Sequence, residues 1–269
     1  MNISICFFSF SRDKLLLTQA LRAIPRLRKN PEDTLTIHLF DDAASPIGTE
    51  TELADFPIYY HATTFNRRGN LNGIDCVRGM ANCFRKVLDA DHPDWLIKAD
   101  SDVFINDLDW IRAIDNTKYG GAGSFSELHF AHGCIYAISP LGLAEIEHQL
   151  TQPDILQRLK RSNCNEDRIF SILIRMRGVP QFRLDAVKNP LDTGRACYQD
   201  LDWEAVKRRE NPSREAILAH YAVSFKHMSY LTRSEAEREA NRADALTRLT
   251  AYANWATSQP LITHTQEGE

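Results

Sequence analysis

The N-terminal part of the 269-residue chain alternates short apolar strands with segments of helical period. The expected strands lie at residues 3–9, 35–39, 58–61 and 95–99. Between them, apolar side chains recur every three or four residues over 13–27 and again over 77–88, the spacing of a helix with one buried face. Strands that alternate with helices form a mainly parallel sheet, because each helix crosses over to the start of the next strand. The sequence therefore predicts an α/β fold of three layers.

The second half of the chain is less regular. Residues 119–125 are rich in glycine and predict a flexible loop, whereas residues 133–139 predict a strand. Ser139 and Pro140 then suit the N-cap and the first position of a helix. A further helix is expected over residues 166–176. After this point the chain turns polar, and a last helix rich in Arg and Glu is expected near the C-terminus.

Charge and composition narrow the class of protein. The formal net charge is −4, whereas a general nucleic-acid binder carries a basic excess. No apolar run reaches the roughly 18 residues of a membrane span, and the N-terminus lacks the basic start of a signal peptide. The six cysteines are scattered, with no Cys-x-x-Cys pair, so we expect them to be reduced and mostly buried. These features favour a cytoplasmic protein that binds no nucleic acid and has no transmembrane segment, and they leave peripheral membrane contact open.

Polar side chains follow the expected strands at the points where the strands end. They are Ser9, Ser11 and Arg12, then Asp41 and Asp42, then Asp100 and Asp102. In parallel α/β sheets, ligands bind beyond the carboxyl ends of the strands. The sequence therefore predicts one ligand site at this edge of the sheet.

The Asp-x-Asp pair is the most informative part of this edge. Asp100 and Asp102 follow the apolar strand that begins at Trp95, and residues two apart on an extended segment project to the same side. Two neighbouring carboxylates repel each other unless a cation lies between them, and hard divalent ions such as Mg²⁺ or Mn²⁺ prefer carboxylate oxygens. A strand that simply ends in solvated turn residues is the competing interpretation. An EF-hand loop is excluded, because Phe104 and Ile105 stand where a ligand and a glycine are needed.

Three segments resemble a known family in the same order along the chain. Lys98-Ala-Asp-Ser-Asp-Val-Phe-Ile105 resembles the Lys-x-Asp-Asp-Asp-Val-Phe-Val segment of inverting β-1,3-glycosyltransferases of the galactosyl, N-acetylglucosaminyl and Fringe types. Gly133-Cys-Ile-Tyr-Ala-Ile-Ser139 is similar to the family's Gly-Gly-x-Tyr-Val-Leu-Ser, and residues 165–171 to its Glu-Asp-Val segment at the head of a helix. The match departs at Ser101, where the family has a middle Asp, and at Arg168. The resemblance implies a GT-A fold, a three-layer sandwich around a Rossmann-like, mainly parallel sheet.

For catalysis, the resemblance implies a base that deprotonates the acceptor hydroxyl. In the family this is the second acidic residue at the head of the helix, here Asp167 beside Glu166. From the residues alone, an acidic first turn that complements the helix dipole is the competing interpretation.

The resemblance to GT-A enzymes also implies a metal, Mn²⁺ or Mg²⁺. Asp100 and Asp102 would be joined by a C-terminal histidine, for which His220 is the candidate and His227 the rival. Lys226 keeps the spacing from His220 that would bring a lysine to the diphosphate of the donor.

The remaining candidates belong to the nucleotide side, where similar folds bind uracil, ribose and phosphates. The residues expected to bind the donor are Ser9, Arg12, Asp41, Asp42, Arg68, Asn72, Lys98, Asp100 and Lys226. Arg68 and its neighbour Arg67 could meet phosphates, and for both a solvated loop charge is the competing interpretation.

The domain organisation follows from the same resemblance. We expect a GT-A catalytic domain over residues 1–230, with a nucleotide-binding half at 1–105 and an acceptor half at 106–230. Residues 231–269 form a C-terminal helical extension, whose mixed charges favour a cap on the core.

The function predicted is a metal-dependent hexosyltransferase that moves a sugar from a nucleotide-sugar, expected to be UDP-linked, to a hydroxyl of a glycan, a lipid-linked or a protein acceptor. A nucleotidyltransferase that makes sugar nucleotides is one alternative, but the segment Ser9-Phe-Ser-Arg12 lacks the glycines of its phosphate loop. A non-catalytic binding module of the same fold is another, and it would leave Asp167 dispensable.

Overall fold

The computed structural model describes residues 1–27, 32–48, 56–65, 73–105, 108–125, 131–161, 166–183, 223–224 and 234–258. The strands of its main sheet are β1 (Asn2–Ser9), β2 (Thr34–Asp42), β3 (Tyr59–Thr63), β4 (Trp95–Asp100), β6 (Gly121–Phe125), β7 (Ala131–Ile138) and β8 (Gln181–Arg183). A small second sheet pairs β5 (Val103–Phe104) with β9 (Val223–Ser224). The helices are η1 (Ser11–Asp13), α1 (Lys14–Arg22), η2 (Ile24–Leu27), α2 (Gly73–Asp91), α3 (Asp109–Arg112), α4 (Pro140–Leu150), α5 (Pro153–Arg161), α6 (Glu166–Arg175) and α9 (Glu235–Ser258).

The main sheet has the order β3-β2-β1-β4-β7-β6-β8. Strands β3, β2, β1 and β4 run parallel, β7 runs antiparallel to both β4 and β6, and β8 is parallel to β6. The expected α/β fold with a mainly parallel sheet is therefore confirmed. The antiparallel β7 lies beside β4, so the segment that resembles the family's Gly-Gly-x-Tyr strand is a direct neighbour of the Asp-x-Asp strand.

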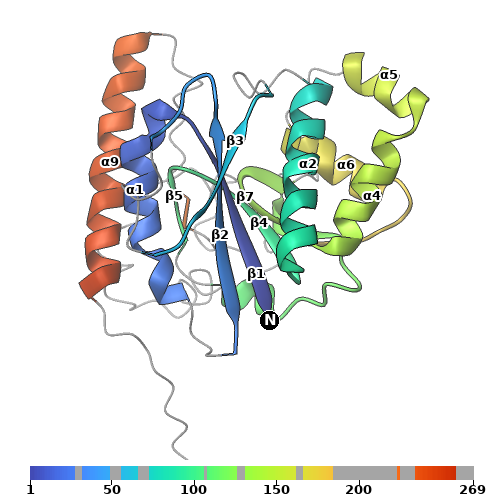
Figure 1. Cartoon of the computed structure of the whole chain (residues 1–269), viewed down its shortest axis with the longest axis horizontal. Coiled ribbons are helices and arrows are strands. Elements are labelled where there is room, and N and C mark those ends of the chain that lie inside the picture. Colours follow the sequence, from blue (N-terminus) through green and yellow to red (C-terminus); the bar gives the residue numbers. More distant parts are fainter. Residues whose placement is uncertain are drawn as a thin grey trace, which may run out of the picture.

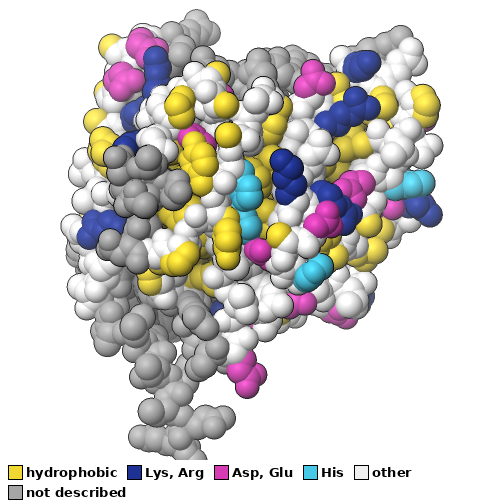
Figure 2. Space-filling model, in the orientation of Figure 1, with side chains coloured by type: hydrophobic (Ala, Val, Ile, Leu, Met, Phe, Trp, Pro, Cys, Tyr) yellow, Lys and Arg dark blue, Asp and Glu magenta, His cyan; other side chains and the backbone are white. Residues whose placement is uncertain are grey.

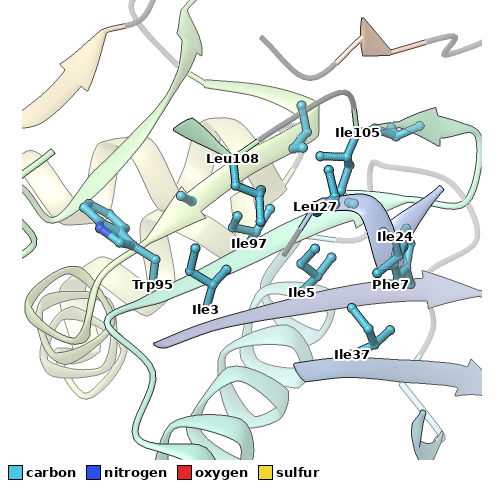
Figure 3. Packing of buried hydrophobic residues seen from close by; sticks show 14 of the residues in the cluster. Ile3, Ile5, Phe7, Ile24, Leu27, Ile37, Trp95, Ile97, Ile105 and Leu108 are labelled. Atoms are coloured by element: carbon cyan, nitrogen blue, oxygen red, sulfur yellow. The ribbon is translucent and has the colours of Figure 1, made fainter. Parts of the chain in front are cut away.

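Helices cover both faces of the sheet and make it the middle of three layers. Figure 1 shows α1 and α9 together on one flank and α2, α4, α5 and α6 on the other. The first face buries alternate residues of β1 and β4, among them Ile3, Ile5 and Ile97, against α1 and η2 (Figure 3). The other face buries the intervening residues, such as Phe8, against α2, α4 and α6. Alternation along each strand thus supplies two separate cores.

The predicted C-terminal helix forms as α9, and it packs on α1 and β5. Leu249 and Ala253 of α9 are fully buried. The described residues carry interspersed positive and negative side chains on the face drawn in Figure 2. Among the helices that the structure describes, none is both long and apolar enough to cross a bilayer.

Two expectations about local structure are wrong. The glycine-rich segment 119–125 is not a loop but contains β6, which hydrogen-bonds to β7 and β8. Its glycines serve close packing, because α4 enters directly over Gly120, and Ser139 donates its backbone N–H to the Gly120 carbonyl at 3.2 Å. The helix expected over 13–27 is shorter: α1 ends at Arg22 and a 3₁₀ turn follows, since Pro25 cannot donate the next backbone hydrogen bond.

Other expectations hold. Ser139 is the N-cap of α4 and accepts a hydrogen bond from the Gly142 N–H at 3.2 Å, with Pro140 at the first helical position. The helix that begins at Glu166 ends before Gly178, whose φ of 83° suits a residue without a Cβ. Of the cysteines that the structure describes as free, Cys6 and Cys83 are buried and Cys76 is half-buried.

The close approach of α4 to β6 makes a stability prediction. Gly142→Ala is expected to lower the free energy of unfolding by about 2 kcal/mol, although alanine favours a helix over glycine by about 1 kcal/mol. The added Cβ would overlap the backbone carbonyl of Gly120, which cannot turn aside. Urea unfolding followed by circular dichroism measures the change.

Gly79→Ala in α2 is the matched control, because the added Cβ there meets the ring of Phe65, a side chain that can move. A smaller loss is expected. Equal losses in the two variants, or a gain for Gly142→Ala, would contradict the packing argument.

Candidate functional site

The carboxyl ends of β1, β2 and β4 meet at one edge of the sheet. Ser9 pairs in register with Asp41, and Phe8 pairs with Asp100. Ser9 and Asp41 are therefore neighbours in space, and Asp100 lies at the same edge of the sheet. The same edge receives the N-terminus of α6, which begins at Glu166.

Lys98 connects the Asp-x-Asp segment to the head of α6. Its side chain is only 2% exposed, and its ammonium group donates to Asp100 Oδ1 and lies 3.7 Å from Glu166 Oε1. The carboxylates of Asp100 and Glu166 are 18% and 13% exposed, so the charges are largely removed from water. A buried charge needs such partners, because an unpaired one costs several kcal/mol. Lys98, predicted to bind the donor, is thus bound to two other predicted site residues.

Tyr136 is a site residue to which the sequence analysis assigned no role. It lies opposite Lys98 in the antiparallel pairing of β4 with β7, and the Lys98 ammonium is 5.7 Å from its ring centroid. Its hydroxyl is buried and has no hydrogen-bond partner among the described residues. Burial first, and then the negative charges of Glu166 and Asp167, raise the pKa of Tyr136 well above that of a free tyrosine. The phenol therefore stays protonated beside the acidic cluster and keeps a proton to donate.

Glu166 and Asp167 occupy the first turn of α6, as predicted. Asp167 is 7% exposed, and its Oδ1 accepts the backbone N–H of Arg168 at 2.6 Å. Two carboxylates here also complement the positive end of the helix dipole. Glu166 also forms an ion pair with Lys98 of β4. An acidic residue that only complemented the helix dipole would not require this pair.

Asp102 follows the turn after β4 and is half-buried. Together with Asp100 it offers the hard oxygen ligands that Mg²⁺ and Mn²⁺ prefer, so the donor chemistry of the pair fits a divalent ion. Among the described residues, no group of three or more His, Cys, Asp and Glu side chains is arranged to hold a metal. The predicted third ligand, His220, and its rival, His227, lie outside the described residues.

The nucleotide side contains buried polar atoms. The Ser9 hydroxyl and Asp41 Oδ1 are buried and find no partner among the described residues. Asp41 Oδ2, in contrast, accepts from the Ile47 N–H at 2.9 Å and from the Tyr60 hydroxyl. Buried polar atoms without partners are rare in folded proteins and point to a missing ligand or water. Ser9 and Asp41 thus offer one donor and one acceptor, side by side in register.

Arg12 and Asp42 form interactions with other described residues. Arg12 lies in η1 and forms an exposed ion pair with Glu235 of α9, with 3.0 Å between Nη1 and Oε1. Asp42 Oδ1 accepts the Ala44 N–H at 2.9 Å and so stabilises the turn after β2. Three further predicted donor contacts, Arg68, Asn72 and Lys226, fall outside the described residues.

Comparisons with known proteins bear on the fold. No protein-family model matches the chain, and no curated protein matches it in sequence. Among solved structures, the galactosyltransferase LgtC, crystallised with donor and acceptor sugar analogues, matches with a TM-score of 0.52 and 13% identity over 96% of this chain and 97% of that one. The glycosyltransferase GlyE of Streptococcus pneumoniae gives a TM-score of 0.47 at 13% identity over 98% of this chain, which spans 65% of the GlyE chain. Mouse xyloside xylosyltransferase 1 gives 0.43 at 12% identity over 82% of this chain and 94% of that one.

The likeness to LgtC concerns the fold, which is the GT-A fold that the sequence resemblance implied. The narrower resemblance to inverting β-1,3-glycosyltransferases stays a prediction.

Removal of the buried lysine tests the architecture of the site. Lys98→Met is expected to lower the free energy of unfolding by about 3 kcal/mol, because Asp100 and Glu166 would keep their charges without a counter-ion. Urea unfolding at neutral pH measures the loss.

Arg85→Met is the control. Arg85 pairs with Glu147 between α2 and α4, but the two side chains are 38% and 33% exposed. Loss of this pair is expected to cost less than about 1 kcal/mol. A Lys98→Met variant no less stable than Arg85→Met would contradict a structural role for the buried ammonium.

Proposed function

We propose that the protein is a metal-dependent glycosyltransferase, a hexosyltransferase that moves a sugar from a UDP-sugar to an acceptor hydroxyl. The observation that carries the proposal is the Lys98 link between Asp100 at the end of β4 and Glu166 at the head of α6. Sugar transfer needs a group that binds the donor diphosphate next to a group that takes a proton from the acceptor. The ion pairs of Lys98 bring a candidate for the donor side, Asp100, and the acidic head of α6 to one edge of the sheet.

The donor side is supported by the unpartnered atoms of Ser9 and Asp41. A uracil edge presents a donor next to an acceptor, and a ribose presents hydroxyls that both donate and accept. A hydroxyl beside a carboxylate oxygen can satisfy either pattern. Asp42, Arg12, Arg68 and Asn72 are proposed to complete the nucleotide site around them.

The metal would be held by Asp100 and Asp102 with His220 as a third ligand, and Lys226 would contact the diphosphate. A bound Mn²⁺ or Mg²⁺ offsets the negative charge that develops on the leaving diphosphate. The protein's own contribution is rigidity: Trp95, Leu96 and Ile97 precede the acidic pair on β4 and are fully buried. A ligand pair carried by such a strand is positioned before the donor arrives.

Asp167 is proposed as the base. It would accept the proton of the acceptor hydroxyl as that oxygen attacks the anomeric carbon, and the configuration at this carbon would invert. Its Oδ1 is oriented by the Arg168 N–H. The protonated Tyr136 hydroxyl, buried near the same carboxylates, supplies a further donor to the cluster.

Two other functions remain as alternatives. A sugar-nucleotide-forming nucleotidyltransferase would bind a nucleoside triphosphate at the same edge. A non-catalytic module would bind the nucleotide but have no use for a base. Neither alternative accounts for the link between the acidic pair and the head of α6 as directly as sugar transfer does.

Ligand binding makes the first functional prediction. UDP with Mn²⁺ at about a hundred times its Kd is expected to raise the Tm by about 5 °C, because a ligand that binds only the folded state stabilises it. Asp102→Asn should abolish the metal-dependent part of the shift. Differential scanning fluorimetry with UDP alone, Mn²⁺ alone and both together measures it.

Asp154→Asn, at an exposed position in α5, is the control and should leave the shift unchanged. A shift with nucleoside triphosphates but none with UDP would favour the nucleotidyltransferase alternative.

The base makes the second functional prediction. Asp167→Asn is expected to lower kcat by about a hundredfold or more while the KM for the donor changes little, since the amide cannot take the proton. Asparagine can still accept the Arg168 N–H, so the fold should persist. The donor is first found by a screen of sugar nucleotides for UDP release with Mn²⁺, and kcat is then measured with an identified acceptor.

Asp154→Asn again serves as the control, because it removes a carboxylate from the first turn of another helix. If Asp167 acted only on the helix dipole, both variants would lose at most about 1 kcal/mol of stability and no activity. Retention of full activity by Asp167→Asn would refute the base, and a product that keeps the donor's α linkage by NMR would refute inversion.

A further inference from the structure

Ser101, the residue between the two aspartates, does not face the acidic cluster. Its side chain is 4% exposed, and its hydroxyl donates to Asp13 Oδ2 at 2.7 Å. Asp13 ends η1 on the other side of the sheet, in front of α1. Asp100 of the Asp-x-Asp turn is therefore attached to Lys98, and Ser101 is attached to Asp13.

Asp13 uses its carboxylate in an unusual way for its position. It is the N-cap residue of α1, where an aspartate ordinarily accepts a backbone N–H of its own helix, yet it makes no such bond. Instead, Oδ2 accepts from Ser101 and Oδ1 accepts from Arg242. The side chain is 16% exposed, so these bonds are largely shielded from water. The carboxylate thus serves a tertiary contact in place of a local one.

Arg242 brings the C-terminal helix α9 into this contact. One guanidinium nitrogen, Nη1, donates both to Asp13 Oδ1 and to the backbone carbonyl of Arg12, the latter at 3.1 Å. The helix that carries it is fixed to the core by the fully buried Leu249 and Ala253. A single residue of α9 thereby holds the loop after β1 directly and the turn after β4 through Asp13.

The hydrogen bonds of Asp13 explain why position 101 is a serine. Position 101 must donate, because both oxygens of Asp13 accept. An aspartate at position 101, as in the family that the segment resembles, would put two carboxylates in contact in a shielded place. Ser101, Asp13 and Arg242 therefore form a matched set of donor, acceptor and donor.

We propose that α9 positions the Asp-x-Asp turn through Arg242, Asp13 and Ser101, so that Asp100 and Asp102 are held ready for the metal and the diphosphate. The C-terminal extension then helps to position residues of the donor site, in addition to packing on α1. Arg242, Asp13 and Ser101 are positioning residues, since they act through the turn. The consequence for catalysis rests on the function proposed above, whereas the consequence for the turn does not.

Hydrogen exchange followed by mass spectrometry tests the turn itself in the full chain. Arg242→Met and Ser101→Ala are each expected to speed amide exchange in peptides covering residues 99–104 by about tenfold, the scale of one hydrogen bond to a charged group. Arg85→Met is the matched control: it also removes an arginine that pairs two elements, but on the α2 and α4 side, and should leave these peptides unchanged. Unchanged exchange over 99–104 in Arg242→Met would overturn the proposal.

Moving the carboxylate from position 13 to position 101 provides a second test that simple loss of packing would not reproduce. Ser101→Asp alone is expected to speed the same exchange, and addition of Asp13→Asn should restore it, because the asparagine amide can donate to the new carboxylate and its oxygen can accept from Arg242. A Ser101→Asp variant that exchanges like the parent chain, or a double variant that is not restored, would overturn the matched set.

The effect on the donor site is measured in the same variants. Arg242→Met is expected to raise the Mn²⁺ concentration needed for half-maximal UDP-dependent stabilisation by about tenfold to a hundredfold, as loss of a partner that orients a metal ligand does. One outcome is that Arg242→Met speeds hydrogen exchange while neither Mn²⁺ nor UDP stabilises the parent chain. That result would count against the proposed function and leave the positioning of the turn supported. If Arg242→Met speeds hydrogen exchange over residues 99–104 but needs the same Mn²⁺ concentration as the parent chain, the role of α9 in the donor site would be overturned.

Discussion

The ammonium group of Lys98 lies almost completely buried in the sheet, where a charge without partners would cost several kcal/mol. It is compensated by two carboxylates, one two residues along its own strand and one from the distant head of α6. The requirement to keep this charge paired constrains both elements. It sets α6 against the end of β4 and holds Asp100 beside Glu166, and the proposed transfer chemistry depends on this arrangement.

Strand β4 serves both faces of the sheet through the alternation of its side chains. Lys98 and Asp100 face the layer that contains α6, while Ala99 packs in the core beneath α1. Ser101 continues to the α1 side and reaches Asp13. The turn that follows the strand is thus attached to both helical layers. Among the described contacts, the end of β4 is linked to α6 through Lys98 and to α9 through Ser101, Asp13 and Arg242.

Much of the fold could be predicted from periodicity alone. Short apolar runs and alternation located β1, β2, β3 and β4 within a few residues, and helical spacing located α2. One exception was an element whose residues serve contacts with distant parts of the chain. The glycines before and within β6 looked like a loop, yet Gly120 is needed because α4 packs directly over it. A second exception had a local cause that the spacing of leucines concealed: α1 ended at Arg22, before Pro25.

The sequence by itself determined the order of the N-terminal strands and helices, the edge at which polar residues gather, and Asp100 and Asp102 as candidate metal ligands. These follow from patterns within a few residues of one another, which local geometry translates directly into structure. The candidate role of Asp167 came from the resemblance to a family. Only the tertiary structure decided what each polar group bonds to: that Lys98 joins two carboxylates, that the Tyr136 hydroxyl is buried beside them, and that Ser101 bonds to Asp13 and through it to Arg242. Except for Lys98 and Asp100, such partners are far apart in the chain, and a charge or hydroxyl takes whichever partner the packing of the layers brings within hydrogen-bond distance.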